Sequence, residues 1–328
     1  MHVAAWVWWT TVLLTTAILL VDVFVIGRRP HEPSTRETSL ALTAYVALAA
    51  VFGLGVWGFA GAQYGGEFFA GWLTEYSLSI DNLFIFIVIM GRLAVPRELQ
   101  QTALLIGIVL ALVLRGIFIA VGAAAINQFS WVFYVFGLFL VITAINLVRD
   151  AGEVEGGYEE PRLVRWVRHH LRMSNDWNGV RLSVHEGGRR LFTPMFLVVL
   201  TLGMTDLLFA LDSIPAIYGL TDQPYLVFTA NVFALMGLRQ LYFLIGDLLK
   251  RLVFLSYGLA FLLLFIGVKL VLHALHENQL PFVNGCEPVG WAPDIPIWVS
   301  LVVILGTLTV TAVASLVRDR VVREGSSA

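Results

Sequence analysis

Long apolar runs with few charges are the feature of this sequence that most limits how the chain can fold. A helix that crosses a bilayer needs about 20 mostly apolar residues. Nine stretches meet that need, and only 13% of the 328 residues are charged, against about 25% in a typical soluble domain. The sequence therefore predicts an all-α, polytopic membrane protein of about nine transmembrane helices. The expected spans are 4–26, 40–60, 67–90, 101–124, 129–149, 192–219, 225–247, 252–276 and 295–317.

The placement of lysine and arginine tests this count, because loops on the cytoplasmic side of a membrane are enriched in these residues. Three of the 21 basic residues, Arg115, Arg239 and Lys269, lie within spans. With the N-terminus placed outside, all the others fall in the cytoplasmic loops or tail. We therefore expect a multi-pass protein of the plasma (inner) membrane, with its N-terminus outside and its C-terminus in the cytoplasm.

Two segments of the chain resemble each other at their polar positions. TEYSLSIDN (74–82) and TDLLFALDS (205–213) both carry a threonine and an acid, and then a second acid six residues after the first. The spans that follow each carry an arginine in a matching frame, in RGIFIAVG (115–122) and RQLYFLIG (239–246). A unit of three spans is odd, so two copies cross the bilayer in opposite senses, as in many secondary transporters. The sequence thus predicts a 3+3 inverted repeat of spans three to five and six to eight.

This repeat divides the chain into five expected parts. The central one is a long linker that is polar at first and then basic. The parts are two peripheral N-terminal spans (1–66), a first three-helix repeat (67–149), a cytoplasmic linker (150–191), a second three-helix repeat (192–276), and an outer loop with the last span and a cytoplasmic tail (277–328).

Ionisable residues within the spans are the candidate functional groups, because each costs at least about 2.5–3.5 kcal/mol near mid-bilayer. The carboxylate, amide and hydroxyl oxygens there favour Mg²⁺, Ca²⁺ or Mn²⁺ over zinc or copper(I). Structural ion pairs between these acids and the three bases are the alternative, since a buried pair can persist without a substrate. The expected metal ligands are Glu75, Asp81, Asn82, Asp206 and Asp212, and the expected supporting or gating residues are Thr74, Thr205, Ser213, Arg115, Arg239 and Lys269.

Helix geometry predicts how these acids are arranged. Residues six apart lie about 9 Å apart along a helix and about 120° around it, so Asp206 and Asp212 do not share a face unless the helix breaks between them. Residues seven apart do share a face, as Asp206 and Ser213 should. Because the two repeats run in opposite senses, we expect two acidic layers about the membrane centre, one of Glu75 with Asp212 and one of Asp81 with Asp206.

Three longer segments carry a resemblance to a known family. EFFAGWLTEYSLSIDNLFIF (67–86), FTPMFLVVLTLGMTDLLFALDSIPAIYGLT (192–221) and PYLVFTANVFALMGLRQLYFLI (224–245) resemble the TerC family of integral membrane proteins, with GVKLVLH (267–273) as a weaker extension. The resemblance implies export of Mn²⁺ from the cytoplasm, and it links the chain to tellurium resistance, metal homeostasis and the metalation of exported proteins. The family's acidic motif positions fall on the five expected ligands, and its lysine falls on Lys269.

Together, the oxygen-rich spans and the resemblance imply a secondary transporter, not an enzyme, that exports a divalent ion in exchange for protons. Neutral carboxylic acids cost less than charged ones in a low-dielectric core, so an empty site is expected to hold protons that the ion displaces. Mn²⁺ is expected as the transported substrate, entering at Asp81 and Asp206 and leaving past Glu75 and Asp212. The expected partners are the cation, protons, the lipid bilayer and membrane or exported proteins, with no prosthetic group and no nucleic acid.

Two other functions are consistent with parts of the sequence. One is a membrane scaffold that supports metalation, secretion or tellurite resistance without transporting an ion. The other is an intramembrane aspartyl hydrolase, which the sequence disfavours because residues 203–206 read GMTD instead of the GxGD pattern of such enzymes. Transport by the purified protein alone separates a carrier from a scaffold.

Overall fold

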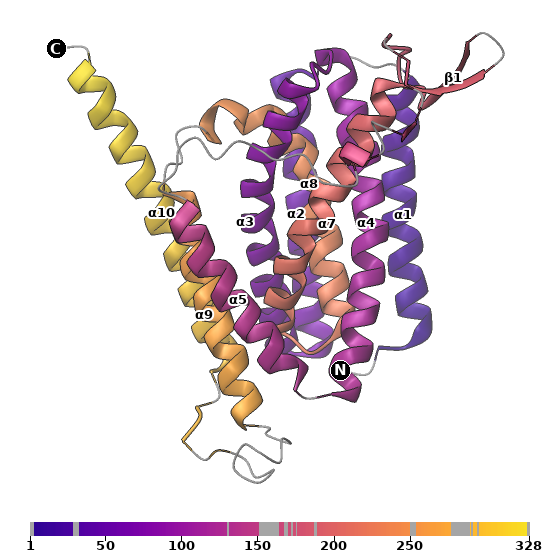
Figure 1. Ribbon diagram of the computed structural model, residues 1–328. Helices are drawn as coiled ribbons and strands as arrows, with labels where there is room; N and C mark the ends of the chain where they lie inside the picture. Colours follow the sequence, from indigo (N-terminus) through magenta and orange to yellow (C-terminus); the bar gives the residue numbers. More distant parts are fainter. Residues whose placement is uncertain are drawn as a thin grey trace.

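The chain forms a bundle of long helices that run alternately up and down (Figure 1). The computed structural model describes residues 3–28, 33–129, 131–150, 164–166, 170–171, 173–174, 176–186, 189–249, 254–276, 289, 291–293 and 295–326. The helices in these ranges are α1 (Ala5–Arg28), α2 (Thr35–Ala60), α3 (Ala62–Arg92), α4 (Arg97–Gln128), α5 (Val132–Asp150), α7 (Pro194–Tyr218), α8 (Pro224–Leu249), α9 (Leu255–His276) and α10 (Ile297–Ser326), and the strands are β1 (Ser183–Glu186) and β2 (Arg189–Phe192).

The prediction of an all-α polytopic membrane protein is confirmed. Among the described residues, eight helices are long and apolar enough to cross a membrane, and α1 adds a shorter apolar stretch, Ala5–Val21. Large apolar side chains project from the surface of the bundle, among them Phe59 at 98% exposure and Val310 at 68%. Soluble monomers rarely expose contiguous apolar surfaces of this kind, whereas lipid tails cover them without cost.

Capping residues explain where two of the helices begin. Ser34 precedes α2, and its side chain accepts a hydrogen bond from the backbone N–H of Glu37 at 3.2 Å. Thr193 caps α7 in the same way, and Pro194 occupies the first turn, where its missing N–H costs nothing. Because Ser34 lies before the apolar run, α2 begins five residues earlier than the expected span 40–60.

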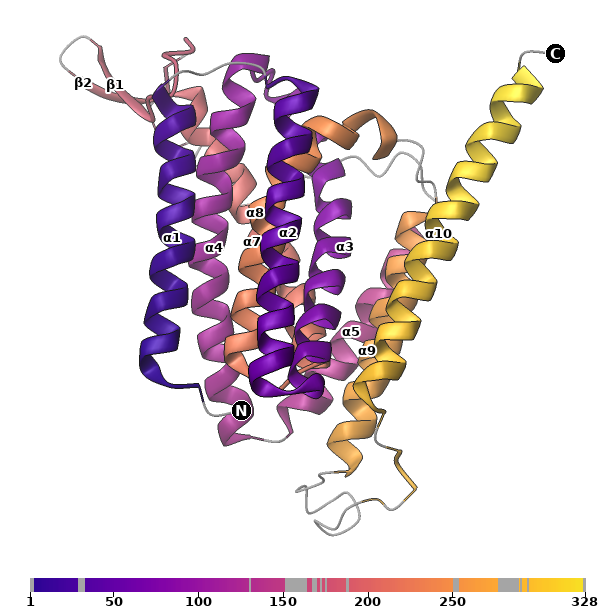
Figure 2. The same ribbon diagram turned by 180° about the vertical axis from the view of Figure 1, so that it is seen from behind.

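The two ends of the bundle are distinct. Figures 1 and 2 show the N-terminus at one end and the C-terminus at the other, as an odd number of crossings requires. The antiparallel hairpin of β1 and β2, which the sequence analysis did not predict, lies at the C-terminal end. We call this end the hairpin end; the beginning of α3, the turn between α7 and α8, and the last turn of α9 lie at the opposite end.

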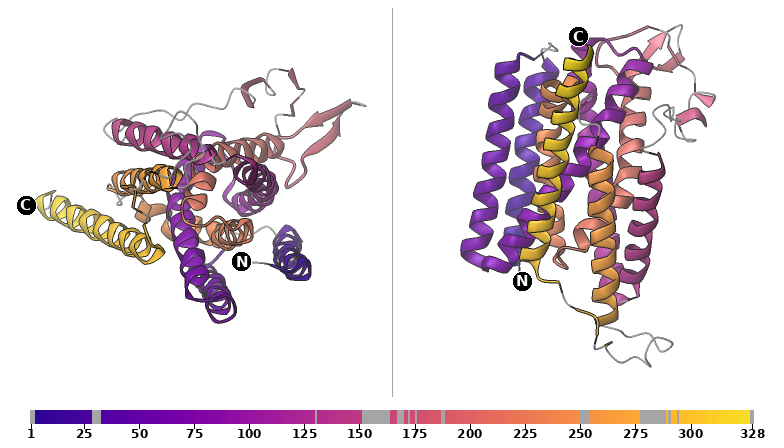
Figure 3. Two further views of the ribbon diagram at one scale, coloured as in Figure 1. Left: turned by 90° about the horizontal axis from the view of Figure 1, so that it is seen from below. Right: turned by 90° about the vertical axis from the view of Figure 1, so that its left-hand side faces the viewer.

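Helix packing follows the pattern expected of two related three-helix units. Helix α3 packs most extensively against α8, α7 against α4, and α5 against α9. Exchanging α3 with α7, α4 with α8 and α5 with α9 leaves this set of pairs unchanged. Seen along the bundle, α5, α9 and α10 gather on one side and α1 lies at the other edge (Figure 3). This pattern supports the inverted repeat, which itself stays a prediction.

Small residues allow the tightest of these helix contacts. A Cβ atom at Gly137 of α5 would lie 2.8 Å from the backbone oxygen of Gly267 of α9. Only a hydrogen fits at that distance, so the two backbones approach as closely as in other small-residue helix contacts of membrane proteins. By contrast, α8 is almost wholly buried, and it forms the axis against which α2, α3 and α4 pack.

Candidate functional site

A buried arginine lies at the centre of the bundle and binds acids from two other helices. Arg115 of α4 is 1% exposed. Its Nε donates to Oδ2 of Asp206 at 2.8 Å, and its Nη2 donates to Oδ1 of the same carboxylate at 3.1 Å. Nη1 donates to Oε1 of Glu75 and forms an ion pair with it. The planar fork of a guanidinium suits such bidentate pairing, so one cation joins α3, α4 and α7.

Two neutral oxygens complete the surroundings of the guanidinium. Nη1 of Arg115 also donates to Oγ of Ser213 at 3.2 Å and to Oδ1 of Asn231 at 2.9 Å. The amide nitrogen of Asn231 donates to the backbone oxygen of Val227 at 2.9 Å, which fixes the amide with its oxygen toward the arginine. The pocket around the guanidinium is therefore made of carboxylate, hydroxyl and amide oxygens from three helices. We call Glu75, Asp206, Arg115, Ser213 and Asn231 the central cluster.

The charges and the hydrogen bonds of the central cluster are not fully balanced. Two carboxylates face one guanidinium, which leaves a formal charge of −1 if both acids are ionised. Oε2 of Glu75 and Oγ1 of Thr74 are buried and have no hydrogen-bond partner within the part of the chain that the structure describes. A buried polar atom without a partner costs about 1–3 kcal/mol. These two oxygen atoms are therefore available as further ligands for a cation.

The expected pairing of the acids into two layers is wrong. Glu75 shares its cation with Asp206 and not with Asp212, and Asp212 instead accepts a hydrogen bond from Thr143 of α5 at 3.1 Å. The reason is that α7 continues unbroken through both of its acids, so their side chains leave the helix about 120° apart. The expected shared face of Asp206 and Ser213 is confirmed, because both accept from Arg115.

The remaining expected ligands lie outside the central cluster. Asp81 is half-buried on α3 and is not among the groups that bind Arg115, while Asn82 is buried on the same helix. Thr205 is buried on α7 beside Asp206 in the sequence. No three His, Cys, Asp or Glu side chains in the described ranges lie close enough together to hold a metal ion.

The other two basic residues of the spans also lie away from the central cluster. Arg239 of α8 is buried, and the side-chain amide of Gln240, oriented to accept, lies 2.7 Å from its Nη2. Lys269 of α9 donates to Oγ of Ser300 on α10 at 3.2 Å. Arg115 and Arg239, which correspond in the predicted repeat, therefore have different environments in this conformation.

Three polar residues near the acids were missed by the sequence analysis. Asn231 lies in an apolar run of α8, and its amide could have been noticed there as an isolated polar group in a span. Ser79 donates to Glu75 at 3.3 Å and Thr143 donates to Asp212. Hydroxyl groups in spans usually bond to their own helix backbone, so their sequence positions gave no signal.

In this conformation the central cluster holds a cation of the protein where a metal cation could bind. The two carboxylates, the hydroxyl of Ser213 and the amide oxygen of Asn231 are hard oxygen donors, the class preferred by Mg²⁺, Ca²⁺ and Mn²⁺. A divalent ion that displaced the guanidinium would find donors from α3, α7 and α8 already directed to one point.

Comparison with known proteins gives a family and several relatives. The family model described as "Integral membrane protein TerC family" matches residues 60–323. An uncharacterized membrane protein of Mycobacterium tuberculosis is 46% identical over 94% of this chain and 78% of its own length. An uncharacterized membrane protein of Myxococcus xanthus is 37% identical, over 95% of this chain and 92% of its own. A protein of Salmonella typhi named "Putative membrane-bound redox modulator Alx" is 35% identical, over 93% of this chain and 92% of its own length. No solved structure matches the chain.

Proposed function

Because the chain belongs to the TerC family of integral membrane proteins, we propose that it is a secondary transporter that exports a divalent metal ion, foremost Mn²⁺, from the cytoplasm in exchange for protons. The observation that carries the proposal is the central cluster. Acids from α3 and α7, which correspond in the predicted repeat, meet there in a buried site, and the other polar groups that the structure describes in it are neutral oxygens and the guanidinium of Arg115.

Charge favours replacement of the guanidinium by a divalent ion. With Arg115 bound, ionised Glu75 and Asp206 leave one negative charge uncompensated, whereas a divalent ion between the same carboxylates leaves none there. The displaced guanidinium stays charged and then needs a new anionic partner or water. The oxygen atoms of Glu75 and Thr74 that lack hydrogen bonds become available as further ligands. A site that alternates between an internal cation and a transported one avoids leaving two unpaired carboxylates buried, a state that is strongly unfavourable.

Exchange for protons follows from the energy of moving charge across the membrane. Each positive charge moved outward against an inside-negative potential costs about 2.3 kcal/mol per 100 mV. Two protons moving inward for each divalent ion would cancel this cost. Asp81 and Asp212, which do not bind Arg115, are the proposed proton-carrying carboxyls, with Thr143 as the hydroxyl partner of Asp212.

The orientation of the protein belongs to the same proposal. We place the hairpin end in the cytoplasm, because Arg92 and Arg97 at the turn between α3 and α4, and Arg190 in the hairpin, lie at that end. The ion then enters from the hairpin end and leaves at the end where α3 begins. The membrane is the plasma (inner) membrane in this proposal.

Transport by the purified full-length chain in proteoliposomes tests the function. Mn²⁺ flux is followed with a trapped fluorescent indicator, and internal pH with a second dye, under an imposed pH gradient. We expect Mn²⁺ movement coupled to opposite proton movement, and a loss of at least about 100-fold in Asp206→Asn, because ligand charge sets divalent-ion affinity. The exposed Glu98→Gln at the start of α4 is the control and should transport normally. Transport by Asp206→Asn at the normal rate would show that Asp206 is not a ligand.

The scaffold alternative makes a different prediction in this assay. Some relatives carry the name "Putative membrane-bound redox modulator Alx", and a scaffold supports other proteins without transporting an ion. Such a protein would move no ion when reconstituted alone. Comparing Mn²⁺ with Mg²⁺ and Ca²⁺ in the same liposomes determines the selectivity, which oxygen donors alone leave open.

A further inference from the structure

A cavity of about 430 Å³ lies at the end of the bundle opposite the hairpin end. It is bounded by the beginning of α3, the turn between α7 and α8, the second half of α9 and the beginning of α10. We call this cavity the outer vestibule. Its volume exceeds that of six water molecules, roughly 180 Å³ at about 30 Å³ each, so a hydrated metal ion fits within it.

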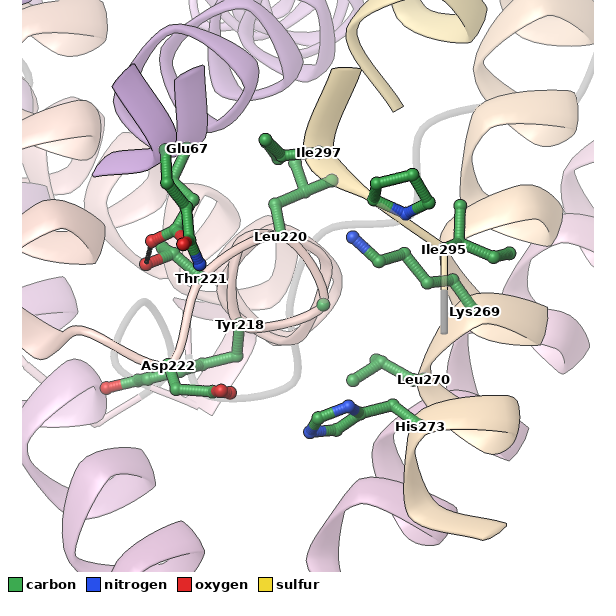
Figure 4. Close-up of a pocket in the computed structure, with 13 residues that line it drawn as sticks. Glu67, Tyr218, Leu220, Thr221, Asp222, Lys269, Leu270, His273, Ile295 and Ile297 are labelled. Atoms are coloured by element: carbon green, nitrogen blue, oxygen red, sulfur yellow. Dashed lines mark hydrogen bonds between the residues drawn. The ribbon is translucent and has the colours of Figure 1, made fainter. Parts of the chain in front are cut away.

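The charged side chains of the outer vestibule lie on opposite walls. Figure 4 shows Glu67 and Asp222 on one side and Lys269 and His273, both from α9, on the other. The amino group of Lys269 points into the space between the walls. Glu67 and Lys269 interact electrostatically across the cavity.

Glu67 is held in place and mostly withdrawn from solvent. It is 8% exposed. Its Oε2 accepts a hydrogen bond from Oγ1 of Thr221 at 2.6 Å, and its Oε1 accepts one from Nε2 of Gln63 at 3.1 Å. Lys269 is tethered on the facing wall by its hydrogen bond to Ser300, which is fully buried. A positioned carboxylate and a separately anchored ammonium group therefore share one cavity.

The outer vestibule and the central cluster lie at different levels of α3. Glu67 precedes Glu75 on α3 by eight residues, about 12 Å along the helix. Between them α3 and α7 pack closely, and a Cβ atom at Gly71 would lie 3.1 Å from Cγ2 of Ile217. Ala70 and Ala216 are fully buried at the same level of the two helices. An apolar layer thus separates the two sites in this conformation.

We propose that the outer vestibule is a second binding station for a divalent cation, in which Glu67 receives the ion that leaves the central cluster and the charge of Lys269, on the facing wall, weakens the binding so that the ion is released. The inference rests on the proposed function, because it makes the vestibule the release side of the same path. Asp222 adds a second carboxylate to the station, and Thr221 and Gln63 orient Glu67.

The central cluster supplies the chemical reason for assigning this role to Lys269. There, a protein cation occupies the carboxylates that a metal ion would bind. In the vestibule the ammonium of Lys269 faces a carboxylate from a different helix, across a cavity rather than in contact. Its charge lowers the affinity of Glu67 for a metal ion, which favours release.

Mn²⁺ binding to the purified full-length protein tests the inference, with free Mn²⁺ measured from its electron paramagnetic resonance signal. The central cluster is first disabled with the double variant Glu75→Gln/Asp206→Asn. We expect one weaker Mn²⁺ site to remain. Adding Glu67→Gln should weaken that site by at least about tenfold, because a ligand charge is lost. Adding Lys269→Met instead should tighten it about fivefold, the size expected for removal of a partly exposed charge.

Glu98→Gln in the same background is the matched control, since it removes an exposed acid at the hairpin end and should change nothing. If the double variant does not fold, the single variant Glu67→Gln in the otherwise unchanged chain should lose only the weaker of two classes of Mn²⁺ site. The inference is overturned if the double variant binds no Mn²⁺, or if its remaining site binds Mn²⁺ equally well after Glu67→Gln is added. It is also overturned if adding Lys269→Met leaves the Mn²⁺ affinity unchanged. Failure of the proposed function is separate, because it appears as absent Mn²⁺ flux in liposomes.

Discussion

The central cluster and the outer vestibule contain the same kinds of groups in different physical states. In the central cluster, two carboxylates contact a guanidinium directly and the side chains are buried. All three nitrogens of the guanidinium donate hydrogen bonds to oxygens of the cluster. In the outer vestibule, a carboxylate and an ammonium group face each other across a cavity of about 430 Å³. The first arrangement binds a new cation only if a protein cation leaves, whereas the second has room for an ion beside its own cation. The difference suggests tight, exchange-coupled binding at the centre and weak, releasable binding outside.

The largest expected effect concerns Arg115, because the comparison requires its guanidinium to stand in for the metal ion. Replacing it in Arg115→Met leaves two buried carboxylates without a cation and should destabilise the protein by about 3–5 kcal/mol. Mn²⁺ at millimolar concentration should then recover much of this loss, since a ligand that binds only the folded state stabilises it. Thermal unfolding in detergent, with and without Mn²⁺, measures both effects.

Arg239→Met is the matched comparison for this experiment. Arg239 is buried on α8, which corresponds to α4 in the predicted repeat, and among the described residues Arg115 is the cation that bonds to Glu75 and Asp206. Mn²⁺ should therefore not rescue its stability. Equal rescue of both variants, or full stability of Arg115→Met without metal, would contradict the replacement of a guanidinium by the ion.

The next largest effect separates the two regions by transport rate. Glu75→Gln removes a carboxylate from the central cluster and should reduce Mn²⁺ flux in liposomes by at least about 100-fold. Glu67→Gln removes the carboxylate of the outer vestibule and should reduce flux by only about tenfold, because the central cluster still binds the ion. Equal losses in the two variants would mean that the sites are not functionally distinct.

The sequence was sufficient for the helices and for much of the central cluster, because both depend on local composition. Apolar length located every long helix in the described ranges, and α8 (Pro224–Leu249) lies within two residues of the expected span 225–247. Helical period placed Asp206 and Ser213 on one face, and both do bind Arg115. The cost of a buried charge singled out Glu75, Asp206 and Arg115 before any contact was known.

The sequence was not sufficient for the partners of these charges, because partner choice depends on how helices turn toward one another. The long side chain of Arg115 reaches acids on two helices, while Asp212 faces α5 and bonds to Thr143. Four segments distant in sequence form the outer vestibule, so no local pattern marks it. The hairpin at 183–192 was also missed, since its strands are only four residues each and lie in a polar linker.

A smaller effect is expected at the apolar layer between the two regions. Gly71→Val places methyl groups against Ile217 and Ala230, whose side chains would lie 3.1 Å and 3.4 Å from the new Cβ atom. Overpacking of this kind costs about 1–3 kcal/mol. We expect Mn²⁺ flux to fall about tenfold while Mn²⁺ affinity at both sites stays unchanged, because the variant blocks passage between sites and not binding. Gly306→Val, where no atom lies within 4 Å of the new Cβ atom, is the control. A loss of affinity in Gly71→Val would place Gly71 in a binding site instead.

The smallest expected effect tests whether Glu67 is positioned or merely present. Thr221→Val preserves the shape of the side chain but removes the hydroxyl that donates to Glu67 at 2.6 Å. Gln63 still donates to Glu67 in this variant, so only part of the positioning is lost. Mn²⁺ affinity in the outer vestibule should therefore fall about two- to fivefold, which lies in the lower part of the range of about 0.5–1.5 kcal/mol for one hydrogen bond. Affinity at the central cluster should not change. Thr309→Val, which loses an exposed hydroxyl bonded to its own helix, is the control. Tighter binding in Thr221→Val would show that the hydroxyl competes with the ion for Glu67, and the vestibule would then resemble the central cluster, with a protein donor that must leave before the metal binds.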